Sequence, residues 1–568
     1  MTNNVSQRNP MKKTLITLLA LAVIGAIAYE QRTDIMLAMI KYKVSREVFA
    51  ESRELPWQQG PATAELEADK RPPNIILIVA DDLGYNDISS LGGGITRTDG
   101  SIVQTPGIDR LAAEGVVFNQ SYSGASTCAP SRAMLMTGRY PTRTGFEFTP
   151  TPDGMGSMVA RIYNEMDNNL PPTIFDASAD KGKPTYELQG LPAEETTLAE
   201  VLNEQGYYTA HIGKWHLGND GDMGPHKQGF DDCLLMTNGL YLPENDPNVV
   251  NAKIPFDPID QFLWAALGFS NSFNSGSSDQ FEPARYLTDY WTDESVKVIK
   301  ANKNRPFFLY LAHWGPHTPL QATREDYEAV GDIKPHRKRV YAAMVRAVDR
   351  SVSRILKTLE EKGLADNTIV MFTSDNGGAG YVGLPESNSP FRGWKITMFE
   401  GGLRVPMFIR WPKHIPAGKT IDTPVAHIDV MPTLAAAAGA PAPKGVEIDG
   451  QNILPLLNDE TNWPRQTLFW QNGHYQVVRH GDWKLQINDR PTDGLQTWLF
   501  NLEEDPTEQH NVSNEYPEKV NELRQLLANH QANARKPLYE AVTQIPVMID
   551  KTLMDKFDAG VEYVYTPN

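Results

Sequence analysis

The stretch Asn74-Ile-Ile-Leu-Ile-Val-Ala80, followed by Asp81-Asp82-Leu83-Gly84, sets the fold class of this chain. A short, uninterrupted apolar run rich in β-branched residues is typical of a strand buried on both faces, as in a parallel sheet. The two aspartates follow at the carboxyl end of the strand, where α/β proteins place their sites. An Asp-Asp pair on its own is more often a solvated turn or helix cap, because adjacent carboxylates repel unless a cation or hydrogen bonds hold them.

The strand pattern recurs along the chain and alternates with helical patterns. Further strands are predicted over residues 116–119, 207–213, 306–312, 368–374 and 405–410, and helices over 105–114, 195–205, 286–301, 336–362 and 429–438. This alternation predicts an α/β fold with a large, mostly parallel mixed sheet flanked by helices. After residue 453, short alternating strands with Gly-Asp turns and a helix over 516–534 predict a smaller α+β domain with an antiparallel sheet.

The predicted organisation has four parts. Residues 1–28 form a signal peptide or anchor, 29–72 an N-terminal connector, 73–452 the catalytic domain, and 453–568 a small C-terminal domain and tail. Two long segments inside the catalytic domain, 147–192 and 238–278, are interpreted as insertions. The first is predicted to be irregular because it is rich in Pro, Gly, Asp and Met, and structureless loops of this length are usually functional.

The N-terminus carries a targeting pattern. Lys12 and Lys13 precede an apolar run over residues 15–28 that ends in an Ala-Ile-Ala sequence, which is typical of a secretory signal. A bilayer span needs roughly 20 residues, so an uncleaved inner-membrane anchor over residues 14–29 is the alternative. The expected location is therefore periplasmic or secreted, with membrane contact only if the segment is retained. The apolar segment 35–42 would lie on a membrane surface or pack on the domain.

Composition restricts the partners. The 568 residues carry a formal net charge of −17, which argues against nucleic acid, because phosphate contacts need a basic face. An acidic protein that handles an anion must concentrate its cations locally. The two cysteines exclude a disulfide framework, and nothing in the spacing supports a bridge between Cys128 and Cys233.

A second stretch, Thr127-Cys-Ala-Pro-Ser-Arg132, holds one of these cysteines. A helical pattern follows, and Pro130 is tolerated in a first helical turn because its missing N–H costs nothing there. Cys128 is therefore predicted at or just before a helix N-terminus, where the helix dipole favours anions. A lone cysteine in a large chain is more often a buried small residue than a nucleophile, so its neighbourhood decides between the two.

Two further predicted strand ends carry cationic or titratable side chains. Lys214 and His216 follow the strand over 207–213, and at i and i+2 they face the same way if the strand geometry persists. Each alone would be an ordinary surface or core residue, whereas the two together between glycines suit an anion. His317 lies between two prolines after the strand over 306–312, in a rigid turn that fixes its direction.

The strand over 368–374 ends in Asp375 and Asn376, which repeats the acidic strand end at Asp81 and Asp82. Three carboxylates and an amide oxygen are hard ligands that suit Ca²⁺ or Mg²⁺. Beyond them, a glycine-rich loop over residues 391–402 presents Lys395.

Together these motifs resemble the type I sulfatases of the alkaline phosphatase superfamily. Five of them stand in the order that this family shows: Asp81-Asp-Leu-Gly84, Cys128-Ala-Pro-Ser-Arg132 with Thr137-Gly-Arg139, Gly213-Lys-Trp-His-Leu-Gly218, Pro316-His-Thr-Pro319 and Ser374-Asp-Asn-Gly377. The resemblance covers about residues 72–513 and implies an alkaline-phosphatase-like fold. It also implies an arylsulfatase-like sulfuric ester hydrolase, whose substrate is an aryl sulfate or a sulfated carbohydrate.

The resemblance implies a modified residue and a metal. Cys128 would be oxidised by a formylglycine-generating maturation enzyme to an aldehyde that hydrates to a gem-diol. One hydroxyl would attack sulfur, and the other would expel sulfate and restore the aldehyde. The implied metal ligands are Asp81, Asp82, Asp375, Asn376 and modified Cys128, with Ca²⁺ expected and Mg²⁺ left open.

The same resemblance gives roles to the remaining polar residues. Arg132, Lys214 and Lys395 would hold developing negative charge. His216 would hydrogen-bond the diol and act as the base in sulfate release. His317, with Lys395, would donate a proton to the leaving oxygen. An acidic protein can bind an anion in this way because three cations and a divalent ion converge on one pocket.

Two features depart from the usual family pattern. Trp394 and Ile396 stand beside Lys395 where members commonly have glycines, and a sulfate-binding side chain that some members carry has no match near Asn238. A close alternative is a formylglycine-dependent phosphonate or phosphate ester hydrolase of the same superfamily. A non-catalytic sulfoglycan-binding protein is an alternative from another class, but a decayed site should have lost at least one of these polar residues.

Overall fold

The computed structural model describes residues 17–567, apart from residues 20, 22, 24, 25, 27, 68, 69, 459–462 and 464. The predicted signal peptide or anchor over residues 1–28 therefore lies largely outside the described residues. In the part of the chain that is described, no helix combines the length and the apolar character needed to cross a membrane.

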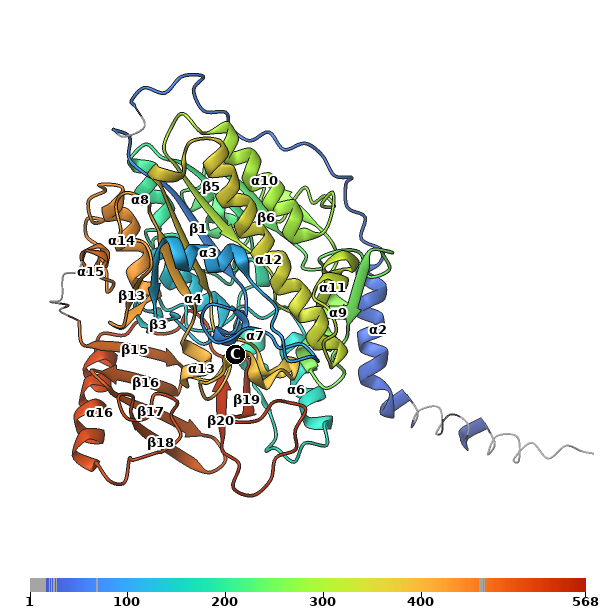
Figure 1. Ribbon diagram of the computed structural model, residues 1–568. Helices are drawn as coiled ribbons and strands as arrows, with labels where there is room; N and C mark the ends of the chain where they lie inside the picture. Colours follow the sequence, from blue (N-terminus) through green and yellow to red (C-terminus); the bar gives the residue numbers. More distant parts are fainter. Residues whose placement is uncertain are drawn as a thin grey trace, which may run out of the picture.

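A nine-stranded mixed sheet forms the centre of the molecule (Figure 1). Five of its neighbouring strand pairs are parallel and three are antiparallel, so the predicted large, mostly parallel sheet is confirmed. In spatial order the strands are β13 (Lys419–Ile421), β2 (Val116–Phe118), β12 (Met407–Arg410), β11 (Thr368–Ser374), β1 (Asn74–Ala80), β9 (Phe307–Ala312), β5 (Tyr208–Gly213), β6 (Asp232–Met236) and β8 (Asn271–Phe273).

Strand β1 is buried along its whole length because helices cover both faces of the sheet. Ile76 and Ile78 pack into one hydrophobic core, whereas Ile75 and Leu77 pack into the other, since successive side chains of a strand point to opposite faces. The first core takes side chains from α3 (Pro106–Glu114), α10 (Leu287–Ala301) and α12 (His336–Glu361), and the second from α4 (Cys128–Thr137), α8 (Leu198–Glu204) and α14 (Val430–Ala437).

The register of the central strands brings their carboxyl ends together. Strand β1 pairs in parallel with β11 and with β9, so that Ala80 lies opposite Ser374 and Val79 opposite Ala312. Backbone hydrogen bonds continue past the strand ends, from Asp375 N to the Ala80 carbonyl at 3.0 Å. The loops that follow β1, β9 and β11 therefore leave the sheet at one common edge.

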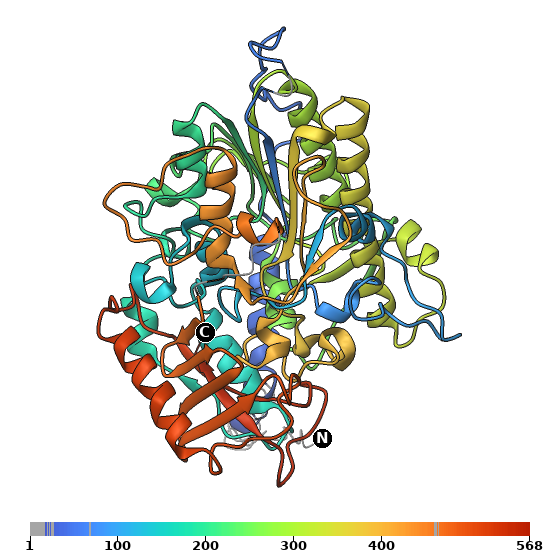
Figure 2. The same cartoon turned by 60° about the vertical axis from the view of Figure 1, so that its left-hand side comes forward.

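The predicted antiparallel sheet of the C-terminal part is present. It has four strands and lies below the central body in Figure 1. It contains β15 (Thr467–Asn472), β16 (Tyr475–His480), β17 (Trp483–Arg490) and β18 (Gly494–Asn501). Helix α16 (Pro517–Gln531) packs Leu523 and Leu527 against Val478 and Leu485 of this sheet. Figure 2 shows α16 along the outer face of the sheet, away from the central body.

The first insertion is more regular than the sequence indicates. It contains α6 (Met155–Glu165), β4 (Ile174–Phe175) and α7 (Ala177–Gly182), so the prediction of an irregular segment over residues 147–192 is wrong. Strand β4 joins β19 (Thr543–Met548) and β20 (Tyr563–Pro567) in a third sheet. The chain tail supplies the partner strand, and β4 is too short to form a sheet of its own.

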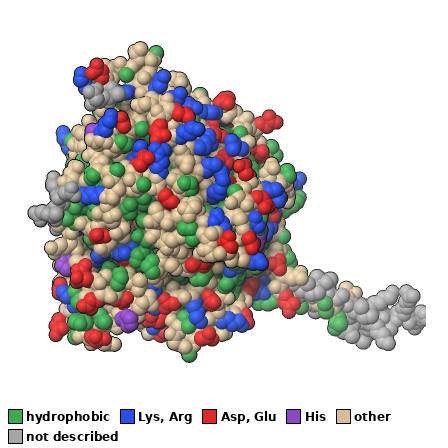
Figure 3. Space-filling view, in the orientation of Figure 1, with side chains coloured by type: hydrophobic (Ala, Val, Ile, Leu, Met, Phe, Trp, Pro, Cys, Tyr) green, Lys and Arg blue, Asp and Glu red, His purple; other side chains and the backbone are tan. Residues whose placement is uncertain are grey.

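The second insertion packs its aromatic side chains. It holds β7 (Val249–Ala252) and α9 (Pro258–Ala266), and Phe262 and Trp264 of α9 are buried. Before the sheet, α2 (Arg32–Val44) lies beside α9, and the connector after it runs along the outside of the body to β1 (Figure 1). Figure 3 shows side chains of both charges interspersed over the face that carries α10 and α12.

Candidate active site

Cys128 is the first residue of α4, as the sequence predicts. Thr127 before it is extended, and the helix ends at Gly138, whose left-handed backbone (φ 66°) suits glycine. The thiol is buried and Sγ lies 3.4 Å from Asp81 Oδ1 and 3.8 Å from Asp82 Oδ1. Helix α4 thus directs its first side chain at the acidic end of β1, and the cysteine is a free thiol.

Arg132, one turn further along α4, joins three strand ends. Its guanidinium lies 2.9 Å from Asp81 Oδ2 and 2.8 Å from Asp375 Oδ2, and it donates to the Lys214 carbonyl at 3.2 Å. All of these side chains are buried. Charge-assisted bonds to two carboxylates fix the arginine, so it holds α4 against the ends of β1, β5 and β11.

Two lysines reach the same cluster from different loops. Lys214 Nζ lies 2.6 Å from Asp81 Oδ2, and Lys395 Nζ lies 2.7 Å from Asp82. Both amines are almost fully buried. The structure therefore brings together the cations that the sequence places at separate positions, after β5 and in the glycine-rich loop.

Burial and pairing act differently on the two adjacent aspartates. Burial raises the pKa of Asp81 to about 6, and the Asp375 carboxylate adds to this effect. Burial acts on Asp82 in the same direction, but Lys395 and His317 outweigh it and hold the pKa of Asp82 below its usual range. The two carboxylates of one strand end thus differ in proton affinity because different cations face them.

The environment of Cys128 disfavours a thiolate. Burial raises the pKa of the thiol well above its usual value, and the carboxylates of Asp375 and Asp81 raise it further. In these surroundings the thiol is held in its neutral form, and the thiolate is the nucleophilic form of cysteine.

His317 points its Nε2 at the cluster. Its Nδ1 lies 2.6 Å from the Thr318 carbonyl, its ring stacks on Trp314 with centroids 3.9 Å apart, and its Nε2 lies 3.5 Å from Asp82 Oδ2. Burial lowers the pKa of His317 well below its ordinary value, although Asp82 opposes this shift. The backbone contact leaves Nε2 as the atom that can exchange a proton with the site.

His216 lies in the same electrostatic environment. Burial lowers its pKa well below the ordinary value, and Lys214 and Arg132 lower it further. Its backbone adopts the left-handed conformation (φ 62°), which is uncommon outside glycine and marks a constrained position. Nδ1 of this ring is buried and has no hydrogen-bond partner among the described residues.

The acidic cluster fits an oxygen-coordinated cation. Asn376 donates its Nδ2 to Asp82 Oδ1 at 2.8 Å, whereas its Oδ1 is buried without a hydrogen-bond partner in the part of the chain that the structure describes. Such an orphaned oxygen beside carboxylates suits a hard ion such as Ca²⁺ or Mg²⁺. Of the five predicted ligands, Asp375 is held by Arg132, and its Oδ1 accepts a bond from Asp82 N at 3.3 Å.

Geometry alone groups a slightly different set of potential ligands. Ligand atoms of Asp81, Asp82, Cys128 and His317 lie within 4.8 Å of one another. We favour the oxygens of Asp375 and Asn376 over the His317 imidazole, because hard cations prefer oxygen ligands.

Tyr381 belongs to the site but carries no signal in the sequence. Its hydroxyl donates to Asp82 Oδ2 at 2.9 Å and accepts from Lys395 Nζ at 3.0 Å. It lies in a short 3₁₀ turn after β11, within a loop whose path is set by tertiary contacts. A tyrosine outside any motif is not distinguishable from an ordinary core residue before the fold is known.

Ile396, one of the two residues that depart from the family pattern, lies in the loop that presents Lys395. Ile396 has φ 70°, a conformation that glycine adopts readily and β-branched residues rarely do. Its N–H donates to the Ser126 carbonyl at 2.8 Å, which ties the loop to the segment before Cys128. The backbone thus keeps the shape that glycine would favour, despite the isoleucine.

His427 supports α4 by hydrogen bonds. Sequence reasoning does not identify this residue. Its Nδ1 lies 3.0 Å from Ser131 Oγ and its Nε2 3.1 Å from Thr373 Oγ1. Ser131 Oγ in turn accepts from Gly124 N at 3.0 Å. This buried chain of bonds links the first turn of α4 to β11 and to the loop before the helix.

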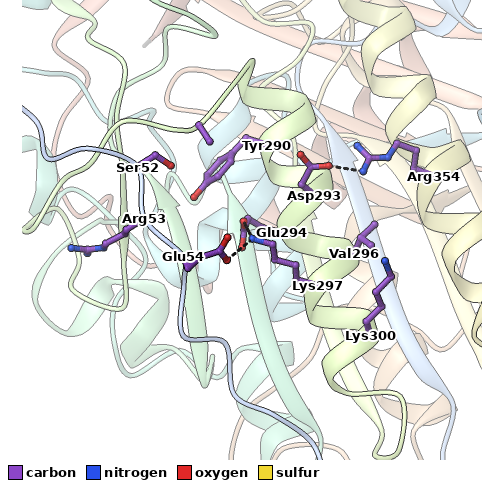
Figure 4. Close-up of a pocket in the computed structure, with 11 residues that line it drawn as sticks. Ser52, Arg53, Glu54, Tyr290, Asp293, Glu294, Val296, Lys297, Lys300 and Arg354 are labelled. Carbon is purple, nitrogen blue, oxygen red and sulfur yellow. Dashed lines mark hydrogen bonds and ion pairs between the residues drawn. The ribbon is translucent and has the colours of Figure 1, made fainter.

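A separate surface hollow lies between the connector and α10 (Figure 4). Its charged side chains largely pair with one another: Lys297 lies 2.9 Å from both Glu294 and Glu54, and Arg354 is paired with Asp293. Because opposite charges alternate there, the hollow lacks the convergent charge of one sign that an ionic ligand requires.

Fold and site together define a hydrolase of anionic esters, built on an α/β sheet with its reactive residue at a helix N-terminus. The Sulfatase family profile matches residues 73–440, and the profile described as N-sulphoglucosamine sulphohydrolase, C-terminal, matches residues 392–536. The chain belongs to the sulfatase family. It is an enzyme of that family, and its reaction is the hydrolysis of sulfate esters.

Known sulfatases are similar over most of the chain. Human N-acetylgalactosamine-6-sulfatase is 32% identical over 426 residues, which cover 73% of this chain and 72% of that protein. Mouse steryl-sulfatase is 33% identical over 478 residues, covering 72% of this chain and 69% of that protein.

Solved structures agree with the fold. The crystal structure of Ps i-CgsB has a TM-score of 0.67 and 32% identity, and covers 83% of this chain and 95% of that one. The same protein was also solved in complex with k-i-k-neocarrahexaose, with a TM-score of 0.66. A phosphonate monoester hydrolase of Agrobacterium radiobacter shares the fold, with a TM-score of 0.53 and 19% identity.

Proposed function

We propose that this enzyme releases sulfate from a sulfated carbohydrate, with a formylglycine made from Cys128 and a Ca²⁺ ion in its site. The position of Cys128 Sγ carries the proposal, 3.4 Å from Asp81 Oδ1 at the start of α4. This sulfur stands in for the oxygen of the formylglycine. The modified residue supplies a hydroxyl nucleophile and a built-in release step.

Five residues would hold the metal: Asp81, Asp82, Asp375, Asn376 and the modified residue 128. The ion would supply Lewis acidity toward a sulfate oxygen. Mg²⁺ remains the second candidate, because both ions take hard oxygen ligands. Among the described residues, Oδ1 of Asn376 is buried and has no hydrogen-bond partner. This free oxygen supports an ion at this place.

The cationic side chains would bind the anion. Arg132, Lys214 and Lys395 converge on the carboxylates around residue 128, in a buried setting where electrostatic interactions are strong. His317 would pass a proton from Nε2 to the leaving oxygen, with Lys395 beside it. His216 would take a proton from the hydroxyl of residue 128 as sulfate is expelled.

The substrate class rests on the relatives. Human N-acetylgalactosamine-6-sulfatase is named for a sulfated sugar, and Ps i-CgsB was solved with a carbohydrate, k-i-k-neocarrahexaose. Steryl-sulfatase is equally similar and acts, by its name, on a different class. A periplasmic or secreted location, with an inner-membrane anchor over residues 14–29 as the alternative, belongs to the same proposal, as does maturation of Cys128 by a formylglycine-generating enzyme.

A release assay tests the substrate class. Inorganic sulfate would be measured from sulfated galactosaminides, carrageenan oligosaccharides, a steroid sulfate and an aryl sulfate, and phosphate from an aryl phosphodiester. We expect the highest kcat/KM on a sulfated carbohydrate. A higher value on the phosphodiester would instead favour the phosphonate or phosphate ester hydrolase.

Chelation tests the metal. We expect EGTA to abolish sulfate release and Ca²⁺ to restore it more fully than Mg²⁺, because five hard ligands with three carboxylates suit the larger ion. The Asn376→Ala variant should need more Ca²⁺ for half-maximal activity. Activity that survives exhaustive chelation would contradict a metal in this site.

A further inference from the structure

Helix α2 is apolar on two opposite faces. Leu37 and Ile40 face the body and pack into a small cluster with side chains of α6 and α9. Ile35, Met39 and Tyr42 follow the same spacing on the other side and are 42%, 67% and 63% exposed. A helix that packs on one partner needs only one apolar face. The second face therefore lacks a partner among the described residues.

Exposed apolar side chains concentrate in this part of the chain. Ten of the fifteen large hydrophobic side chains that are exposed in the described residues lie between residues 18 and 48. Single exposed apolar residues are ordinary on soluble proteins, whereas a concentration of them marks an interaction surface. The second face of α2 therefore belongs to the part of the described chain in which exposed apolar side chains concentrate.

The chain before α2 indicates what covers this region. The apolar run over residues 15–28 leads directly into the helix, and its described side chains Leu18, Leu19 and Leu21 are each more than half exposed. A run of this composition partitions into lipid, and it would bring the next turns of helix to the bilayer surface.

Charge and aromatic placement agree with a lipid surface. Lys43 lies in the last turn of α2, and Arg46, two residues beyond the helix, donates to the Tyr42 hydroxyl at 2.9 Å. Tyr29, which precedes α2, and Tyr42, near the end of the helix, are 68% and 63% exposed. Tyrosine rings and long basic side chains are the residues that settle at the headgroup level of a membrane.

We propose that α2 is an interfacial helix: its face formed by Ile35, Met39 and Tyr42 lies in the headgroup region of an anionic lipid bilayer, while its other face holds the catalytic body through α9. Helix α9 in turn packs on the body through the buried side chains of Phe262 and Trp264.

A fluorophore at position 39 tests the proposal independently of how residues 15–28 bind. Met39→Cys and, as a matched control, Leu495→Cys would be labelled with an environment-sensitive dye in the full chain. Leu495 is 51% exposed on the C-terminal sheet, and the native thiols Cys128 and Cys233 are buried. The unsubstituted chain gives the background labelling. Each protein would be mixed with vesicles of phosphatidylcholine, with and without phosphatidylglycerol.

We expect a blue shift and a loss of quenching by aqueous iodide at position 39 on vesicles, larger with phosphatidylglycerol, and neither change at position 495. A chain that floats with vesicles while position 39 stays as quenchable as position 495 would overturn the proposal. So would a chain that does not float with vesicles at all. A shift at position 39 without vesicles that grows with protein concentration would instead assign the face to a second copy of the chain.

Discussion

Tyr381 connects a lysine and an aspartate of the site through one hydroxyl. Because it accepts from Lys395 and donates to Asp82, Tyr381→Phe should leave the lysine less firmly placed. We expect kcat to fall by about tenfold to a hundredfold, the range for loss of one hydrogen bond to a charged group. Comparing aryl sulfates of different leaving-group pKa would show a larger loss for poorer leaving groups, since the role proposed for Lys395 is to assist the leaving oxygen.

The matched control for this variant is Tyr163→Phe. Tyr163 is also a buried tyrosine, and its hydroxyl has no hydrogen-bond partner among the described residues. It should keep both kcat and the leaving-group dependence. A Tyr381→Phe enzyme that loses the same activity on every leaving group would show that the tyrosine only stabilises the fold.

For single residues, the sequence indicates those whose chemistry is unusual at their position. Asp81, Asp375 and His317 follow buried strands, and such positions in α/β proteins favour sites. The structure places Tyr381 and His427 in the same network through contacts between segments far apart in the chain. No local pattern records such contacts, so these two residues could not be predicted.

The support of helix α4 by His427 predicts a pH dependence of stability. Burial lowers the pKa of His427 to about 3, with Arg132 contributing, whereas histidine in an unfolded chain titrates near 6.5. Between these values the unfolded chain binds the additional proton. The contribution of His427 to stability is therefore fully present above pH 6.5 and is lost as pH falls toward 3.

His427→Gln should remove this contribution. Its free energy of unfolding, measured by urea titration at several pH values, should depend less steeply on pH between 6.5 and 4, by up to about 1.4 kcal/mol per pH unit. His510→Gln is the control, because that histidine is exposed. Equal slopes for His427→Gln and the unsubstituted enzyme would show that His427 does not remain neutral in the fold.

Elements with strong patterns were predicted well. Residues 74–80 and 368–374 form strands with the predicted bounds, and the long helix begins at His336 and ends within one residue of the prediction. The insertion 147–192 was not, because α6 and β4 depend on partners elsewhere: β4 pairs with β19, some 370 residues along the chain. Turn-forming residues dominate the local composition and hide these elements.

For the whole molecule, a buried ion network joins the C-terminal sheet to the catalytic body. Lys484 of β17 lies 2.8 Å from Glu400 and 3.0 Å from Glu508, and all three side chains are fully buried. Lys484→Met would leave Glu508 without its cation. We expect a loss of about 3–5 kcal/mol in the free energy of unfolding, as for a broken buried pair. Urea unfolding measures this loss.

Two comparisons separate the network from general effects. Adding Glu508→Gln to Lys484→Met should restore much of the stability, because it removes the uncompensated charge. Lys519→Met, which breaks the partly exposed pair with Glu522, should cost less than about 1 kcal/mol. If Lys484→Met is as mild as Lys519→Met, the network does not hold the two parts together.

Three cations are concentrated at one place in a molecule that is acidic as a whole. A net charge of −17 is unfavourable for an anionic substrate, yet Arg132, Lys214 and Lys395 meet at one buried place. Residue 128 lies among these cations, and we propose that it is the nucleophile in its modified form.

Mass spectrometry of the peptide that contains residue 128 tests this claim most directly. The enzyme would be produced with the formylglycine-generating maturation enzyme, and occupancy of the modified form would be compared with specific activity across preparations. We predict a residue that has lost sulfur and gained oxygen, with activity proportional to its occupancy, and Cys128→Ala without turnover. A fully active preparation that carries an unmodified thiol at residue 128 would contradict the account.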